Sequence, residues 1–533
     1  MKLATLDRKN GTHMKNTLFS SENKDLGLFF TLDVDTELSK ILRKAFELYR
    51  RYPRIERLIT RDLDAYGIEK KKERLLDAAW VKQQTLSLGL NYSESPENPA
   101  KIDLALGRKR MEPLVAYILL LLEGDFQSLT DKQATERILD SKTLEFFFQF
   151  YGLGAIPARS TRHENVRKIS QTTQDYILKQ QLFMVRDDFL DNFEYLTVDS
   201  TAVKANSVWP TDSGLLNDIL HRTYHLSQQL HERFGIPNFL QWYMPMWLKK
   251  MNQLNFQINV TSGKGARRKR KKLYDKLYTV AEKAIFHMKR ELDKHRAQKD
   301  ELNILPGKLS QLNILWDFIE DYISDAEQVI SYSKERILEE KVIKNEDKVI
   351  SLSDGSAAFI TKGDRETVVG YRPQLGRSQN GFVTALIVPE GNAADSPQLL
   401  PLVKRTIKNT GVIPSCVSAD DGYSSNQGVR TVKAEGVNWV SINGAKGKKL
   451  TSDIDWISEE LTEARRMRSA VESLMFVLKH VLGFGKLRRR NIESVRLEML
   501  QKVIVHNFRQ MIIVEERNEK RQRQERAKVF QAS

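Results

Sequence analysis

Three acidic residues stand where a carboxylate could do chemistry. Asp199 lies in the middle of residues 195–203, an apolar, β-branched stretch in which a carboxylate is unfavourable. Asp420 ends a second apolar stretch and opens an Asp-Gly turn, and Glu472 lies within a helical pattern. Taken singly, each residue also fits an ordinary role: Asp199 could cap a strand end or pair with an arginine, Asp420 could stabilise a turn, and Glu472 could lie on a surface helix. Together, a strand centre, a strand end and a helix face supply the oxygen ligands that two-metal phosphoryl transfer needs.

The helix predicted around Glu472 places cations beside that carboxylate. At about 100° per residue, Arg465, Arg468, Glu472 and Lys479 fall within an arc of about 60°. A neighbouring apolar stripe would pack this helix on the core. A surface helix that mixes charges for stability is the alternative interpretation. The stripe consists of Met467, Val471, Leu474, Met475, Leu478 and Leu482.

Other residues with metal-binding or stacking potential receive ordinary interpretations. His221 and His225 share a helix face, but no Cys or well-placed Glu supports a zinc pair, so we expect a solvated or phosphate-facing side. Trp242 and Trp247 are expected to pack in a helical core. Trp456 is expected to pack in the core as well, with stacking on a DNA base as the alternative.

The composition favours a polyanionic partner. The 533 residues carry 85 Lys and Arg against 69 Asp and Glu, a formal charge of +16. Nucleic acid is the first candidate, with ribosomal association or an anionic membrane surface as alternatives. Cys416 is the only cysteine, which excludes an internal disulfide and suits a reducing compartment. Residues 1–24 lack a signal peptide's apolar core, and the apolar run 114–122 predicts a buried helix rather than a membrane span.

Hydrophobic periodicity divides the chain into segments that position these residues. Strands are predicted at 349–352, 367–371, 382–388, 415–419 and 437–442, with helices near 395–408, 426–435 and 458–482. Hairpin-like strands followed by alternating strands and helices indicate an α/β order. The predicted segments are a loose lead-in (1–35), a helical DNA-binding region (36–190), a first core strand (191–211), a helical insertion (212–347), the remaining core (348–514) and a charged tail (515–533).

Two segments could read or hold DNA. A helical stretch at 130–151 is followed by a Gly/Pro turn and by Thr161 and Glu164, which are spaced as a capping box. This pattern fits a helix-turn-helix, and an ordinary helical hairpin fits it equally. The six consecutive cations at 267–272 are interpreted as a DNA backbone contact, with a solvated helix end or a localisation signal as alternatives.

Several motifs together resemble the DDE transposases of bacterial insertion sequences. The first Asp is followed by Ser and Thr in Asp199-Ser200-Thr201, and the second lies in Ala419-Asp420-Asp421-Gly422-Tyr423. The segments Thr211-Asp212-Ser213-Gly214-Leu215-Leu216 and Gly391-Asn392-Ala393-Ala394-Asp395 are similar to further family elements. In the family's Tyr, Arg, Glu, Lys signature, Arg468, Glu472 and Lys479 match, while Arg465 occupies the Tyr position.

The resemblance implies an α/β ribonuclease-H-like core with a mixed five-stranded sheet, a mainly α-helical N-terminal region and a helical insertion after the first core strand. It implies that Asp199, Asp420 and Glu472 are catalytic and bind two Mg²⁺ (or Mn²⁺), whereas Asp421 is a variable position. A non-transposing nuclease and a decayed, DNA-binding transposase are the alternatives. The expected DNA-binding residues are Arg465, Arg468, Lys479, Lys486, Arg488, Arg489, Arg490, Arg267, Arg268, Lys269, Arg270, Lys271 and Lys272.

The family also implies the partners and the place of action. The enzyme would bind terminal inverted repeats and target DNA, and it would work as a homodimer or a larger synaptic complex. Water would attack a phosphodiester at the element's end, and the freed 3′-hydroxyl would attack target DNA. The expected location is the bacterial cytoplasm, in association with the nucleoid.

Overall fold

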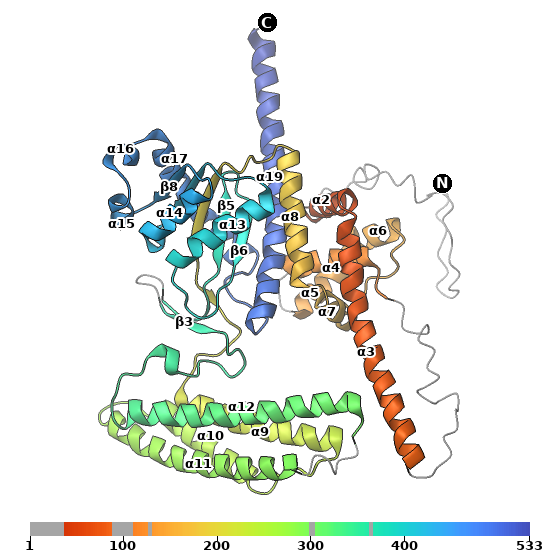
Figure 1. The fold of residues 1–533 in the computed structure, drawn as a ribbon, viewed down its shortest axis with the longest axis vertical. Coiled ribbons are helices and arrows are strands. Elements are labelled where there is room, and N and C mark those ends of the chain that lie inside the picture. The colour runs from red at the N-terminus through yellow and green to blue at the C-terminus, as the bar shows by residue number, and fades with distance from the viewer. Residues whose placement is uncertain (1–36, 88–109, 126–130, 298–303, 362–365, 533) are drawn as a thin grey trace.

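The computed structural model describes residues 37–87, 110–125, 131–297, 304–361 and 366–532. A mixed five-stranded sheet stands at its centre in the order β6-β5-β1-β7-β8 (Figure 1). β1 pairs with β5 and β5 with β6 in antiparallel fashion, whereas β1 pairs with β7 and β7 with β8 in parallel. This sheet with its helices confirms the predicted α/β core and is consistent with a ribonuclease-H-like domain. The strands are β1 (Tyr195–Ser200), β5 (Gln374–Ser378), β6 (Val383–Ile387), β7 (Cys416–Ala419) and β8 (Trp439–Ile442).

The central parallel strands are buried along most of their length. In β1 every residue after Tyr195 is buried, and all four residues of β7 are buried. Strands covered on both faces need apolar or small side chains on both, which accounts for the near-continuous β-branched and small residues of these segments. A carboxylate at the end of such a strand therefore emerges at the rim of the sheet.

Helices cover the sheet and join it to the rest of the chain (Figure 1). α13 packs against β6 and β5, and α17 packs against β7, β8 and β1. The predicted helices at 395–408 and 426–435 are confirmed; the first begins and ends a few residues later than predicted, and the second ends one residue earlier. The helices are α13 (Leu399–Thr410), α14 (Asn426–Ala434), α15 (Ala445–Lys449), α16 (Asp453–Trp456), α17 (Glu459–Arg468), α18 (Ala470–Phe476) and α19 (Ile492–Ala532).

Two of the strand predictions need correction, and one core strand was missed. Residues 349–352 form no strand, and the predicted strand at 367–371 belongs to a separate three-stranded sheet, β2-β4-β3. The second core strand is β5, whose sequence QLGRS shows no apolar alternation. Its polar side chains are buried and form hydrogen bonds inside the protein. The small sheet consists of β2 (Val203–Lys204), β3 (Ala358–Ile360) and β4 (Val368–Tyr371).

The N-terminal helices pack around α19. The apolar run 114–122 lies in α4, where its residues are buried as predicted, and α4 and α8 both lie against α19. Across the described residues, no helix is both long and apolar enough to cross a membrane. The helices are α2 (Glu37–Arg51), α3 (Arg54–Ser87), α4 (Pro113–Asp125), α5 (Asp131–Leu139), α6 (Lys142–Phe150), α7 (Arg159–Val166) and α8 (Gln171–Asp187).

Local details of this helical region differ from the predictions. The helical stretch predicted at 130–151 is two helices, because Ser141 caps a new one and accepts the amide of Leu144. The capping box at Thr161 is wrong, since α7 begins at Arg159 and its N-cap, Ala158, has no side chain that could cap it. The predicted lead-in lies outside the described residues.

In the sequence, four helices follow β2 and precede β3; they form a layer that lies below the sheet in Figure 1. It has its own apolar core, and Thr211 caps its first helix by accepting the amide of Gly214 at 3.1 Å. Asp212 and Arg336 join its first and last helices at 2.5 Å. The helices are α9 (Asp212–Phe234), α10 (Met244–Val260), α11 (Ala266–Ala297) and α12 (Pro306–Ile337).

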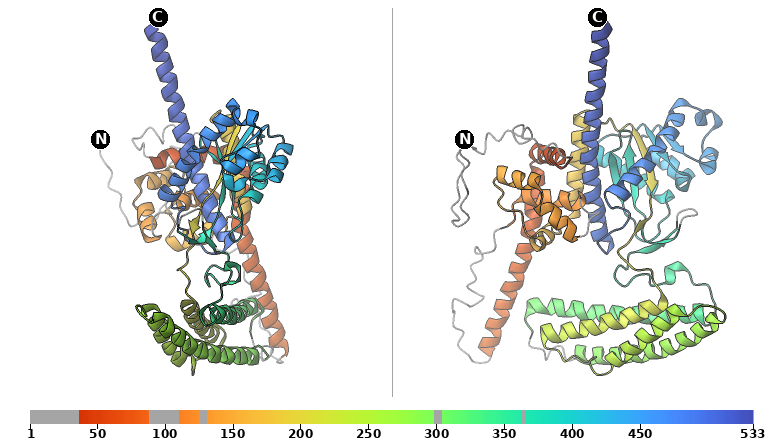
Figure 2. Two further views of the ribbon diagram at one scale, coloured as in Figure 1. Left: turned by 90° about the vertical axis from the view of Figure 1, so that its left-hand side faces the viewer. Right: turned by 180° about the vertical axis from the view of Figure 1, so that it is seen from behind.

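The N-terminal region also reaches this layer. In both views of Figure 2, α3 runs from the upper helices down to one end of the layer. Asp77 of α3 accepts the backbone amide of Gly307 at 2.7 Å, in the first turn of α12. The prediction that Trp242 packs in the core of this layer is wrong, since its side chain is 79% exposed. Trp247 is half-buried and packs against that core. The charged tail continues α19 as an exposed helix that projects past the body (Figure 1).

Candidate active site

The sheet brings Asp199 and Asp420 to the same edge. Val198 of β1 is paired with Ala419 of β7 in parallel register, and each aspartate directly follows its member of this pair. Asp199 is buried and accepts the amide of Ser200 at 2.7 Å. Asp420 is half-buried and accepts the amide of Gly422 at 3.0 Å. Two carboxylates from adjacent central strands therefore lie at one rim of the sheet.

The neighbouring Asp421 has a different task. Its Oδ1 accepts the backbone amides of Lys446 at 3.1 Å and Gly447 at 3.0 Å, at the start of α15. Gly444 holds a left-handed φ of 112°, and a Cβ there would lie 2.7 Å from Cγ of Asp421. Asp421 thus fixes the loop after β8, and Asp420 is the member of the pair that neighbours Asp199.

A buried polar layer lies behind the two aspartates. Arg372 forms an ion pair with Asp395, and Gln374 donates to the same carboxylate at 2.9 Å. Tyr423 donates its hydroxyl to the side-chain oxygen of Gln374, and Arg372 also reaches Oγ of Ser200 at 3.4 Å. This layer ties the strand that carries Asp199 to the turn that follows Asp420.

The hydroxyl of Tyr423 lies near three carboxylates, and their charges affect its pKa. Burial, followed by the negative charges of Asp395, Asp199 and Asp420, raises the pKa of the Tyr423 hydroxyl far above its usual range. The phenol therefore keeps its proton and remains a donor within this acidic group. Arg372 and Gln374 were not predicted from the sequence, because a polar Arg-Pro-Gln stretch gives no periodic signal. The one available signal was Asp395, which stands in a family-like segment.

Glu472 does not join the two aspartates in a three-residue cluster. It is exposed on α18, whose Val471 and Leu474 are buried and which packs near β1. In the described part of the chain, no three His, Cys, Asp or Glu side chains gather closely enough to hold a metal ion. The fold thus brings Asp199 and Asp420 together and leaves Glu472 outside that pair. All three donors are carboxylate oxygens, which suit Mg²⁺ or Mn²⁺.

The helix that carries Glu472 is not the continuous α-helix predicted at 458–482. Ser458 caps it as its Oγ accepts the amide of Leu461, but α17 ends at Arg468 and α18 begins at Ala470. A π-helical turn, η6 (Val477–Val481), follows α18. A π turn holds more residues than an α turn, so Lys479 departs from the position that an ideal wheel gives it. The predicted apolar stripe is buried except for half-buried Met467 and Met475.

Arg465, the first cation of this helix's basic arc, is held by contacts with the protein. The guanidinium of Arg465 lies 4.4 Å from the ring centroid of Trp456 and donates to its carbonyl oxygen at 2.7 Å. Trp456 is half-buried beneath this arginine, so it is not the core residue that was predicted. Arg468 and Lys479 are also half-buried.

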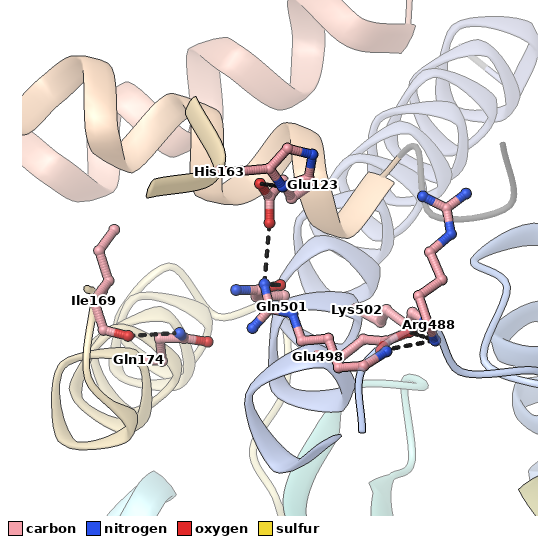
Figure 3. Close-up of polar contacts among 9 residues, drawn as sticks. Glu123, His163, Ile169, Gln174, Arg488, Glu498, Gln501 and Lys502 are labelled. Carbon is pink, nitrogen blue, oxygen red and sulfur yellow. Dashed lines mark hydrogen bonds and ion pairs between the residues drawn. The ribbon is translucent and has the colours of Figure 1, made fainter. Parts of the chain in front are cut away.

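The basic segment that follows is tied into the fold at its backbone. Glu498 of α19 accepts the amides of Arg488 and Arg489 and pairs with Lys502 at 2.9 Å (Figure 3). The Glu498 and Lys502 side chains are 1% and 0% exposed. Arg489 is turned inward to Glu123 at 3.0 Å, a position that favours a structural role over DNA contact. Lys486 and Arg490 are exposed, and Arg488 is half-buried.

The run 267–272 lies at the start of α11. Arg267 and Lys271 pair with Glu340, and Arg270 donates to the carbonyl of Thr261. The remaining members are exposed, and no ion pair joins them to another described residue: Arg268, Lys269 and Lys272. Elsewhere in this layer, His221 contacts Asn252 and His225 contacts Gln229, each on the exposed side of α9.

Comparison with known proteins gives a family match. Residues 348–508 match the family model described as the transposase DDE domain. The matched range contains Asp420 and Glu472 and begins after the four-helix layer, so Asp199 precedes it. No curated protein matches the chain. No solved structure matches it either.

Proposed function

We propose that the protein is a DNA-cleaving and strand-transferring enzyme that mobilises an insertion sequence by acting on that element's own ends, because residues 348–508 match the family model described as the transposase DDE domain. The observation that carries this proposal is the pair Asp199 and Asp420 at one rim of a mixed five-stranded sheet. The formal charge of +16 supports a polyanionic substrate.

We propose that Asp199, Asp420 and Glu472 hold two Mg²⁺ or Mn²⁺ ions. The first two are neighbours, and Glu472 lies on a short helix bounded by a break after Arg468 and by a π turn. Such irregular helix segments frequently occur at functional sites. When bound, the ions lower the pKa of the attacking hydroxyl and offset the charge that develops on the phosphate.

The chain's own residues position the substrate for in-line displacement at phosphorus. The layer of Arg372, Gln374 and Tyr423 holds the two strand ends rigid, so that the aspartate oxygens keep a fixed spacing. Arg468 and Lys479 would hold DNA phosphates beside the cleaved bond. The attacking group is water in the first step and the freed 3′-hydroxyl in the second, and one site serves both.

The proposed partners are the element's terminal inverted repeats, target DNA and a second copy of the chain. Exposed Arg268, Lys269 and Lys272 on the four-helix layer supply a basic surface away from the sheet. A long duplex that lies along the four-helix layer while it passes the catalytic rim would contact this surface. This supports a role of the layer in holding the DNA ends.

The test is an in vitro reaction with linear DNA that carries the element's ends and a supercoiled target, with Mg²⁺ or Mn²⁺ present. We expect cleavage at the element's ends followed by joined products with the target. Cleavage without joining would favour a nuclease on the same core. Specific binding of the ends without any cleavage would favour a decayed transposase and contradict the proposal.

A further inference from the structure

A cavity of about 520 Å³ lies where six segments of the chain meet, and neither Asp199 nor Asp420 lines it. Its walls come from the end of α4, from α5, from α7 and the turn after it, from Asn206, from the segment 488–490 and from the first turns of α19. The helical region and the catalytic core therefore share this cavity.

The walls are strongly basic. The lining contains five arginines, Arg162, Arg167, Arg488, Arg489 and Arg490, and two glutamates, Glu123 and Glu498. Glu498 is neutralised by buried Lys502 outside the cavity, and Glu123 pairs with Arg489. The positive charges thus exceed the negative ones, and an anion that enters would be attracted.

The same contacts hold the walls in place. Glu498 accepts the amides of Arg488 and Arg489, so that the backbone of this segment cannot drift. Figure 3 shows the Arg488 side chain leading away from Glu498 and Lys502, so it is the backbone, not the guanidinium, that meets this pair. Arg162 is 2% exposed and donates to Thr135 at 2.8 Å. Fixed guanidinium groups lose little freedom when they bind an anion.

We propose that this cavity binds a backbone phosphate of the DNA substrate. Arginine forks match the geometry of phosphate oxygens, and the two exposed members, Arg167 and Arg490, come from different segments of the lining, the turn after α7 and residues 488–490. A phosphate held there would fix the DNA against α7 and against the segment that follows the Glu472 helix at the same time. The identity of the phosphate as DNA rests on the proposed function, whereas the anion site itself does not.

The experiment measures DNA affinity as a function of salt for the full chain and its variants. Arg167→Gln and Arg490→Gln remove exposed charges from the cavity, and Arg57→Gln removes an exposed charge from α3 as the matched control. We expect each cavity variant to lose about 3- to 10-fold in affinity, and the double variant to lower the salt slope by about one. Equal losses in Arg57→Gln, or no loss in the double variant, would overturn the proposal.

A second arm separates this inference from the proposed function. Isothermal calorimetry with inorganic pyrophosphate tests the anion site without DNA or catalysis, and we expect binding that the double variant loses. If pyrophosphate binds but the double variant keeps its DNA affinity, the site takes a free anion and the DNA assignment is wrong. If the wild type binds pyrophosphate and DNA but never cleaves, the proposed function fails and the cavity assignment stands.

Discussion

Residues 488–490 and residues 267–272 are two runs of cations that differ in their contacts with the rest of the protein. The first is tied through its backbone to Glu498 and turns Arg489 inward to Glu123. The second lies along the exposed start of α11, where two of its members share Glu340 and three others face solvent. A run of cations in a sequence therefore does not reveal whether its charge serves stability or a partner; the acidic residues placed opposite it decide.

The largest expected effect breaks the anchor of the first run. Lys502→Met leaves Glu498 buried without its cation, and we expect a loss of about 3–5 kcal/mol in the free energy of unfolding. Lys271→Met is the matched control in the second run, where the side chain is 31% exposed and the loss should stay below about 1 kcal/mol. Urea denaturation measures both. Equal losses would mean that the two runs do not differ in this way.

The second expected effect concerns DNA binding by the exposed run. Replacing Arg268, Lys269 and Lys272 together by Gln should leave stability within about 0.5 kcal/mol of the wild type. The slope of log affinity against log salt should fall by about 2 to 3, since each neutralised phosphate contributes about 0.9. The double variant Arg267→Gln/Lys271→Gln is the control, because these side chains already pair with Glu340. A larger effect in that control would assign the DNA contact to the paired cations.

The smallest expected effect is a pH dependence at Glu123. Burial raises the pKa of this carboxyl above the ordinary value of 4.5, although Arg489, Arg162 and Arg167 act against it. The folded protein therefore keeps a proton that the unfolded chain has lost, and stability falls as the pH rises from 4.5 through the folded pKa. Glu123→Gln removes this slope, so its stability relative to the wild type should rise over the same window. Thermal unfolding at stepped pH measures it, and a gain of relative stability on acidification would contradict the assignment.

The sequence predicted the sheet where strands are buried on both faces and failed where polar side chains are buried. β1 and β7 were found because their β-branched and small residues make an unmistakable run. β5 was missed because Gln374 and Ser378 point into the protein and bond to Asp395 and Asp191. Only the tertiary partners make such a strand favourable, and no local pattern encodes them.

The candidate site shows the same division. The neighbouring positions of Asp199 and Asp420 follow from two adjacent strands, and motif spacing pointed to both residues. The geometry around Glu472 could not be predicted, because a break after Arg468 and a π turn at Val477–Val481 alter the regular helix on which the wheel depended. The exposure of Trp242 was likewise invisible to a rule that buries aromatic residues.

The most direct test of the central claim compares cleavage by four variants with Mg²⁺ or Mn²⁺: Asp199→Asn, Asp420→Asn, Glu472→Gln and Asp421→Asn. The account predicts that the first three lose cleavage by at least about 10³-fold while still binding DNA, because each removes a proposed metal ligand. Asp421→Asn should still cleave, since its oxygen only accepts the amides of Lys446 and Gly447. Full cleavage by the first three variants, or a loss confined to Asp421→Asn, would contradict the account.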